Sequence, residues 1–294
     1  MAKLDKALDI AYTKYMYNLN IHAPLSDAII AFTSEPQVYR LTVVDDEMHV
    51  KGCLSAMKIL DLLIKKVCDI TEAEGERSLT KFLAEPVLLF HDECLHRLSE
   101  NIALKGALEY IIHNRAEHIS LVDSLNVLRG ILTDGKVLNR LPFEKYGIHI
   151  SHIMTPNAIT TSLHESIKTA VAKMSMHQIK HLLIMDEDSV QGLVCVMELF
   201  NIIVRRKDSF KLVLDLCQEP LKNFKRKEIA TFLPEEDVGA VIKKFREEFV
   251  HAVAIVSSED KLLGIVTTKD IITKLPDILG LDTFTKLLNV NSAS

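Results

Sequence analysis

The sequence predicts an α/β (α+β) protein made of four tandem copies of one small helix-strand-strand-helix unit, paired into two modules. Two observations predict this fold. A pattern of strand, turn, glycine and helix occurs four times along the chain, and repeats of this kind decide the architecture. An amphipathic helix precedes each copy. With 294 residues, 48% of them hydrophobic, the chain can bury the cores of such units.

The repeated pattern is an apolar run that ends in a polar turn, followed by glycine, two apolar residues and a small residue. Each run is short and apolar enough for a strand in a sheet covered by helices. A helix follows the small residue. The four strand pairs are residues 39–45 with 52–55, 118–123 with 130–133, 181–186 with 192–195, and 251–256 with 264–267.

The helices of the repeats are predicted from apolar residues at helical spacing. The helix before the third strand pair is capped by Ser162 or Ser166, and the one before the fourth by Asp237. Beyond Pro276 further apolar positions predict an additional packing helix in the tail. The apolar positions are Ala28, Ile29 and Phe32; Ile102, Ala103, Ala107, Leu108 and Ile111; Ile167, Ala170, Val171 and Met174; Val238, Val241, Ile242 and Phe245; and, in the tail, Ile278, Leu279, Leu281, Phe284, Leu287 and Leu288.

Composition predicts a cytoplasmic protein. The net charge of -5 argues against an extended nucleic-acid surface. The five cysteines form no CxxC pair, so neither a zinc ribbon nor a disulfide framework is indicated and reduced thiols are expected. The N-terminal stretch lacks the continuous apolar core of a signal peptide, and no apolar run is long enough for a membrane span.

The repeats resemble the CBS domain, whose copies pair into Bateman modules, over roughly residues 20–276. The run Ile153-Met154-Thr155-Pro156, followed by Ile159-Thr160, resembles the entry of such a domain. A four-repeat chain without an appended enzyme resembles stand-alone prokaryotic CBS proteins and the gamma subunit of AMP-activated protein kinase. The resemblance implies CBS repeats at residues 20–68, 78–141, 149–206 and 216–276, with Bateman modules at 1–145 and 146–294, the second including the C-terminal helix. Proline and glycine interrupt the helical pattern at the boundary, near residues 141–147.

The resemblance also implies a nucleoside site in the cleft of paired repeats, where an Asp at the start of the last helix holds the ribose hydroxyls. Only the fourth repeat has the complete pattern, with Thr267 to cap the helix and Asp270 three residues later. The alternative is that these two residues only cap the helix. The other repeats depart from the pattern: Lys58 and Lys136 replace the Asp in the first and second, and could instead meet an anion such as phosphate, and the third has Cys195 with Glu198.

Position in the repeat adds candidates around this site. Five residues are expected to line a base pocket, although ordinary core packing is the alternative: His251, Ala252, Val253, Ile229 and Ala230. A basic run could neutralise a phosphate chain, or could be a solvated face: Lys222, Lys225, Arg226 and Lys227. The predicted ligand-binding set is Thr267, Asp270, His251, Ala252, Val253, Ile229, Ala230 and Lys227.

No pattern indicates catalysis. His149 and His152 have a ligand-like spacing, but no cysteine or second histidine pair accompanies them, so no metal is predicted. The phosphate-binding, dinucleotide-binding and nucleophile-elbow motifs are missing from the sequence. No histidine base can be assigned to the serine or cysteine at the cap position, so no nucleophilic triad is supported. The sequence therefore predicts a protein that is not an enzyme and requires no cofactor.

These observations lead to two functional hypotheses. The first is a regulatory ligand sensor that binds AMP, ADP, ATP or S-adenosylmethionine in the cleft of the third and fourth repeats, and acts on a partner protein or on its own assembly. The second is a structural adaptor or dimerisation module without a nucleotide, because three of the four ribose positions are lost. Bateman modules commonly associate, so a homodimer or an internal pseudo-dimer is expected, together with an unidentified regulated protein. Nucleic acid is not expected as a partner.

Overall fold

The computed structural model describes residues 6–13, 16–34, 39–70, 72–93, 96–205, 209–224 and 228–290. Contacts divide the chain into two compact units. Unit 1 consists of Met1–Met16, Leu95–Ala158 and Ile229–Ser294, and unit 2 of Tyr17–Cys94 and Ile159–Glu228. Each unit therefore combines two repeats that are not consecutive in the chain: the second with the fourth in unit 1, and the first with the third in unit 2. The grouping of residues 1–145 and 146–294 into Bateman modules stays a prediction.

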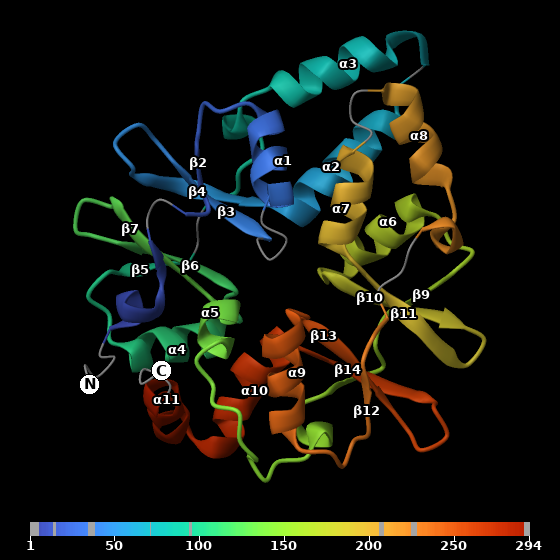
Figure 1. The fold of residues 1–294 in the computed structure, drawn as a ribbon. Helices are drawn as coiled ribbons and strands as arrows, with labels where there is room; N and C mark the ends of the chain where they lie inside the picture. The colour runs from blue at the N-terminus through green and yellow to red at the C-terminus, as the bar shows by residue number, and fades with distance from the viewer. Residues whose placement is uncertain are drawn as a thin grey trace. The chain divides into compact units, whose positions relative to one another are not determined.

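Unit 2 has the predicted order of helix, two strands and helix in both of its repeats (Figure 1). The two long strands of each repeat are antiparallel, and a short strand ahead of the first helix adds to them in parallel. The first repeat comprises β2 (Asn18–Asn20), α1 (Leu25–Ser34), β3 (Arg40–Val44), β4 (Val50–Ser55) and α2 (Ala56–Cys68), followed by α3 (Glu72–Ala84) and the 3-10 turn η2 (Val87–Leu89). The third comprises β9 (Thr160–Ser162), α6 (Ile167–His177), β10 (His181–Asp186), β11 (Ser189–Cys195) and α7 (Val196–Val204), followed by α8 (Phe210–Gln218) and η4 (Leu221–Asn223).

Unit 1 repeats this arrangement and adds an edge strand to each sheet. The sheet orders are β1-β7-β6-β5 and β12-β13-β14-β8. The second repeat comprises β5 (Arg97–Ser99), α4 (Leu104–Asn114), β6 (His118–Val122), β7 (Leu128–Thr133) and α5 (Asp134–Leu138), with η1 (Ala7–Ile10) and β1 (Tyr12–Thr13) from the N-terminal segment. The fourth comprises β12 (Thr231–Phe232), α9 (Val238–Glu248), β13 (Ala252–Val256), β14 (Leu262–Thr267) and α10 (Thr268–Leu279). It is joined by η3 (Ile150–His152) and β8 (Thr155–Pro156) from residues 149–158, the linker ahead of β9, which the sequence assigned to the third repeat but which belong to unit 1. The last helix is α11 (Leu281–Val290).

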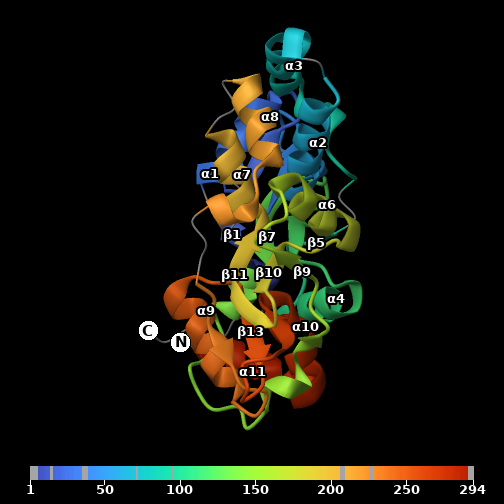
Figure 2. The same ribbon diagram turned by 90° about the vertical axis from the view of Figure 1, so that its right-hand side faces the viewer.

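The apolar helical stripes found in the sequence form the cores of the units. In unit 2, Phe32 of α1 and Phe200 of α7 are both fully buried and meet edge to face, with 5.8 Å between ring centroids. In unit 1, α10 lies beside α4 in both views (Figures 1 and 2), and α11 packs on both helices. Phe284 and Leu288 of α11 are fully buried, which confirms the packing helix predicted beyond Pro276. Helix α10 continues through Pro276 to Leu279, so Ile278 and Leu279, which the sequence assigned to the tail helix, belong to α10.

In three of the four repeats, a backbone carbonyl group of a neighbouring segment lies too close to the repeat glycine to leave room for a side chain. A Cβ atom on Gly264 would lie 2.6 Å from the carbonyl oxygen of Thr155 in β8. On Gly130 it would lie 3.1 Å from the carbonyl oxygen of Tyr12 in β1, and on Gly52 it would overlap the carbonyl of Asp92. Glycine is needed there because a further segment crosses the second strand at that point.

Candidate ligand site at the start of helix α10

Thr267 and Asp270 form a capping box at the start of α10. The Asp270 amide donates a hydrogen bond to Thr267 Oγ1 at 3.4 Å. Asp270 Oδ2 accepts hydrogen bonds from the Thr267 amide at 2.8 Å and from the Thr267 hydroxyl at 2.7 Å. Both residues therefore take part in the helix cap, the alternative that the sequence left open.

The second carboxylate oxygen of Asp270 is held by groups outside this cap. Asp270 Oδ1 accepts a hydrogen bond from the Thr155 hydroxyl at 2.7 Å and pairs with Lys274 Nζ at 2.7 Å. Asp270 is only 7% exposed. A carboxylate has about four acceptor positions, so all of those on Asp270 are occupied by groups of unit 1.

Lys274 also ties the preceding linker to α10. Its ammonium group donates to the carbonyl oxygens of Ile153 at 2.9 Å and Met154 at 3.2 Å, and lies 2.9 Å from Thr155 Oγ1. The Met154-Thr155-Pro156 motif and the Asp270 motif, which the sequence singled out separately, thus meet in the structure. No local pattern linked them, because register between β8 and β14 brings Thr155 opposite Ile265.

The predicted base-pocket residues lie at the same end of this sheet. Ala252 pairs with Thr267 across β13 and β14, and the His251 Nδ1 lies 3.3 Å from the Thr268 hydroxyl. The Ala254 amide donates to the carbonyl of Ala230, which places the half-buried pair Ile229 and Ala230 beside β13. Ala252 and Val253 are buried, and Val253 belongs to the core, as the packing alternative expected. Lys227 lies outside the described residues, as do Lys225 and Arg226.

In the first and second repeats, too, the residue at the position of Asp270 contacts a side chain of the segment beside the second strand, but through a different kind of interaction. In the second repeat, Lys136 Nζ lies 3.9 Å from the centroid of the Tyr12 ring. In the first, Lys58 Nζ pairs with Asp92 Oδ1 at 2.5 Å. Each lysine stands where the fourth repeat has Asp270, and each contacts a side chain of its own unit. The paired edge residues are Thr155 with Ile265, Tyr12 with Ile131, and Asp92 with Cys53, each opposite the residue that follows the repeat glycine.

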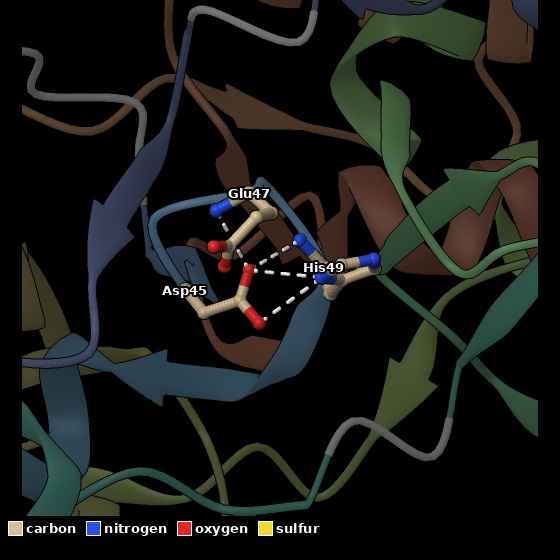
Figure 3. Close-up of side chains that lie close together, drawn as sticks. All are labelled: Asp45, Glu47 and His49. Carbon is tan, nitrogen blue, oxygen red and sulfur yellow. Dashed lines mark hydrogen bonds and ion pairs between the residues drawn. The ribbon is translucent and has the colours of Figure 1, made fainter.

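A second cluster of ligand-type side chains lies in the turn between β3 and β4 (Figure 3). Asp45, Glu47 and His49 bring their ligand atoms within 4.8 Å of one another. Asp45 Oδ1 accepts the amide hydrogens of Glu47 at 3.1 Å and His49 at 2.8 Å, and Oδ2 pairs with Lys51 Nζ at 2.9 Å. Desolvation acts to raise the pKa of Asp45, but hydrogen bonds from Lys51 and His49 outweigh it and hold the pKa well below its usual range.

The second repeat builds its turn in the same way. Asp123 Oδ1 accepts the amide hydrogens of Leu125 and Val127, each at 2.9 Å, and Oδ2 pairs with Arg129 at 2.6 Å. Hydrogen bonding from the Val127 amide lowers the pKa of Asp123. A basic side chain thus pairs with the carboxylate in both turns. The hydrogen bonds that form the turn therefore explain why Asp45, Glu47 and His49 lie close together, without a metal ion.

The remaining metal and thiol candidates are accounted for by packing. The rings of His149 and His152 stack with 5.9 Å between centroids, and among the described residues no third ligand group joins them. Cys53, Cys68, Cys195 and Cys217 are not in disulfide bonds. Burial raises the pKa of the Cys217 thiol to about 12, so it stays protonated and unreactive near neutral pH. Among the described residues, no helix combines the length and the apolar character needed to cross a membrane.

Comparisons with known sequences find CBS domains in part of the chain. The CBS domain model matches residues 150–205 and 221–277, which contain the third and fourth repeats. An uncharacterized 33.4 kDa protein in a ribosomal RNA operon of Thermofilum pendens is 22% identical over 266 residues, which is 88% of this chain and 87% of that protein. The CBS domain-containing protein CBSCBSPB1 of Arabidopsis thaliana is 23% identical over 256 residues, 72% of this chain and 47% of that protein.

A weaker match concerns an enzyme. Homoserine O-acetyltransferase of Methanococcoides burtonii is 24% identical over 166 residues, which is 56% of this chain and 26% of the enzyme. The chain thus spans about half the length of the Arabidopsis relative and about a quarter of the acetyltransferase.

Two solved structures share the fold over nearly the whole chain. Protein MJ1225 of Methanocaldococcus jannaschii, proposed as an archaeal homologue of g-AMPK, is 17% identical with a TM-score of 0.78, covering 92% of this chain and 99% of that one. An uncharacterized conserved protein of Pyrococcus horikoshii is also 17% identical, with a TM-score of 0.59 over 91% of this chain and 98% of that one. The third and fourth repeats thus match the CBS domain model, and the first and second repeats have the same order of helix, two strands and helix.

Proposed function

We propose that the chain is a non-catalytic regulatory protein that binds an adenosyl ligand, such as AMP, ADP, ATP or S-adenosylmethionine, at the start of α10. The observation that supports this proposal is the buried carboxylate of Asp270 beside Thr267, in the first turn of a twelve-residue helix. A carboxylate can accept both hydroxyls of a ribose, and the positive end of a helix dipole favours a phosphate nearby. The chain spans only a quarter of the acetyltransferase that it matches, so no acetyltransferase activity is proposed.

A structural adaptor is the second candidate function. It is favoured by contacts at the helix starts. The acceptor positions of Asp270 are all occupied by groups of unit 1, and Lys58 and Lys136 each contact a side chain of their own unit. In either case we propose a second copy of the chain and an unidentified regulated protein as partners, and the cytoplasm as the compartment. The sequence placed the ligand in the cleft of the third and fourth repeats, which belong to different units, and our proposal therefore concerns the fourth repeat within unit 1.

Calorimetric titration with the four adenosyl compounds tests the proposal. We expect one compound to bind near one site per chain, and Asp270→Ala to weaken its binding by about 10- to 100-fold, because a hydrogen bond to a charged group is lost. Asp277→Ala is the matched control, since Asp277 is an exposed carboxylate on the same helix. Absence of heat with all four compounds, together with an unchanged melting temperature, would favour the adaptor.

A further inference from the structure

We infer that Thr155 sets the ligand affinity of this site by competing for the carboxylate of Asp270, and that ligand binding releases residues 153–156 from α10. This inference rests on the proposed function and concerns its regulation. It assigns to the linker that precedes the third repeat a role in reporting whether the fourth repeat is occupied.

The hydrogen bonds to the two carboxylate oxygens of Asp270 differ in whether they can be broken without disrupting α10. Both donors to Oδ2 come from Thr267, in the first turn of the same helix. The donors to Oδ1 are Lys274, one turn along α10, and Thr155, which is 115 residues away in the sequence. Contacts to Oδ2 cannot open without loss of the helix cap, whereas Thr155 can leave Oδ1 with α10 intact.

A ribose diol needs hydrogen-bond acceptor positions, and none of those on the Asp270 carboxylate is vacant. Each of the two hydroxyls donates one hydrogen bond, while all four acceptor positions of Asp270 are occupied. A ligand must therefore displace the contacts to Oδ1, and the Thr155 hydroxyl is a direct competitor. A hydrogen bond to a charged acceptor is among the stronger kinds, and the free energy needed to break it when the ligand binds lowers the affinity of the wild-type protein.

The same contacts hold the linker in place. Strand β8 pairs with β14 over two residues, Thr155 opposite Ile265 and Pro156 opposite Gly264. Proline has no amide hydrogen to donate, so the strand pairing alone is weak. Lys274 donates to the carbonyl oxygens of Ile153 and Met154, and its position depends on its ion pair with Asp270. The amides of the same two residues donate to the carbonyl oxygen of Ile150. Displacement at Oδ1 therefore removes the side-chain contacts that hold this segment to α10, and leaves the turn at Ile150 in place.

The test combines one variant with one measurement on the unaltered protein. Thr155→Val keeps the branched shape suited to a strand and removes the hydroxyl. Thr13→Val is the matched control, because Thr13 is an exposed threonine on the edge strand β1 of the second repeat. We expect Thr155→Val to bind the adenosyl compound about tenfold more tightly, with Thr13→Val unchanged. In the wild-type protein, saturating ligand should accelerate hydrogen exchange of residues 153–156, with the amides of α9 as internal reference.

The outcomes separate this inference from the function on which it rests. Weaker binding by Thr155→Val would make Thr155 a ligand contact and overturn the competition. Binding that Asp270→Ala abolishes, but that Thr155→Val leaves unchanged, would overturn the inference and retain the proposed function. Unchanged or slower exchange of residues 153–156 on ligand binding overturns linker release without the need for any variant. Absence of binding by both the wild-type protein and Thr155→Val overturns both.

Discussion

Lys136 places its ammonium group 3.9 Å from the centre of the Tyr12 ring, joining the start of α5 to the edge strand β1. The fourth repeat has Asp270 and Thr155 in the same two places, joined by a hydrogen bond. In both repeats of unit 1, the residue at the position expected to hold a ribose therefore contacts a side chain of the edge strand. The contact is present in both repeats, although one is a cation above a ring and the other a hydrogen bond. We therefore interpret it as a structural feature of the repeat. In the fourth repeat the same feature includes a carboxylate that can bind a ligand.

The contact between Lys136 and Tyr12 should contribute measurably to stability. A cation above an aromatic ring is worth about 0.5–1 kcal/mol at a partly exposed position. We expect a double-mutant cycle of Lys136→Met and Tyr12→Leu, followed by urea denaturation, to return a coupling of about that size. Lys136→Met and Thr13→Val should instead be additive. A coupling near zero for the first pair would contradict the interaction.

Alanine should have opposite effects at two glycines of unit 1. At Gly264 a Cβ would lie 2.6 Å from the carbonyl oxygen of Thr155, so we expect Gly264→Ala to destabilise the protein by about 1–3 kcal/mol. At Gly106, inside α4, the nearest atom lies 3.5 Å away, so Gly106→Ala should stabilise by about 0.5–1 kcal/mol. Chemical denaturation of both variants checks the pair, and equal signs would argue against the close approach of β8.

The charge on Asp237 should stabilise unit 1 at neutral pH, and this stabilisation should be lost at acidic pH. Its side chain accepts the amide hydrogens of Tyr146 at 3.0 Å, and of Gly147 and Gly239 at 2.8 Å. Desolvation acts to raise the pKa of Asp237, but these backbone hydrogen bonds outweigh it and lower the pKa. The stabilisation is therefore present above the pKa of the unfolded chain, and is lost as the pH falls through the lower pKa of the folded state.

The variant Asp237→Asn tests this dependence. It should cost about 1–2 kcal/mol at neutral pH, through the loss of charge-assisted hydrogen bonds at a helix cap. Urea denaturation between neutral and acidic pH should show the difference between variant and wild type shrinking as the pH falls. A difference that stays constant across this range would contradict a charged cap.

Phe200 should be among the most sensitive core positions of unit 2. It is fully buried and meets Phe32 edge to face. Its replacement in Phe200→Ala should cost about 3–5 kcal/mol through lost burial and the cavity left behind. Met176→Ala, at a position 73% exposed on α6, should stay within about 0.5 kcal/mol of the wild type. A small effect of Phe200→Ala would contradict the packing of α1 on α7.

Sequence patterns predicted the long elements because their burial is periodic. The stripe that includes Ile29 and Phe32, and the strands beside each repeat glycine, carry enough apolar residues to be recognised. The entry strands β2, β5 and β9 were not predicted. They are three residues long and mainly or wholly polar, and their parallel pairing is set by the neighbouring strand rather than by their own composition.

The candidate site was predicted in its local part only. Three-residue spacing was enough to join Thr267 to Asp270, and the structure adds that both close the helix cap. Thr155 was noticed as part of a motif but not as a neighbour of Asp270, because the register of a two-residue strand cannot be obtained from local sequence. The path of α10 through Pro276 was likewise missed, since proline usually marks the end of a helix.

The place of β1 in unit 1 has a consequence for synthesis on the ribosome. Tyr12 is made early, but its partner in the sheet is Ile131, and the core of the same unit is closed by Phe284 and Leu288 near the end of the chain. The edge strand therefore stays unpaired until β7 has been synthesised, and unpaired edges are prone to aggregate. The core of unit 1 cannot close until α11 has been synthesised as well, and contacts between residues so far apart in the sequence are expected to make its folding slow.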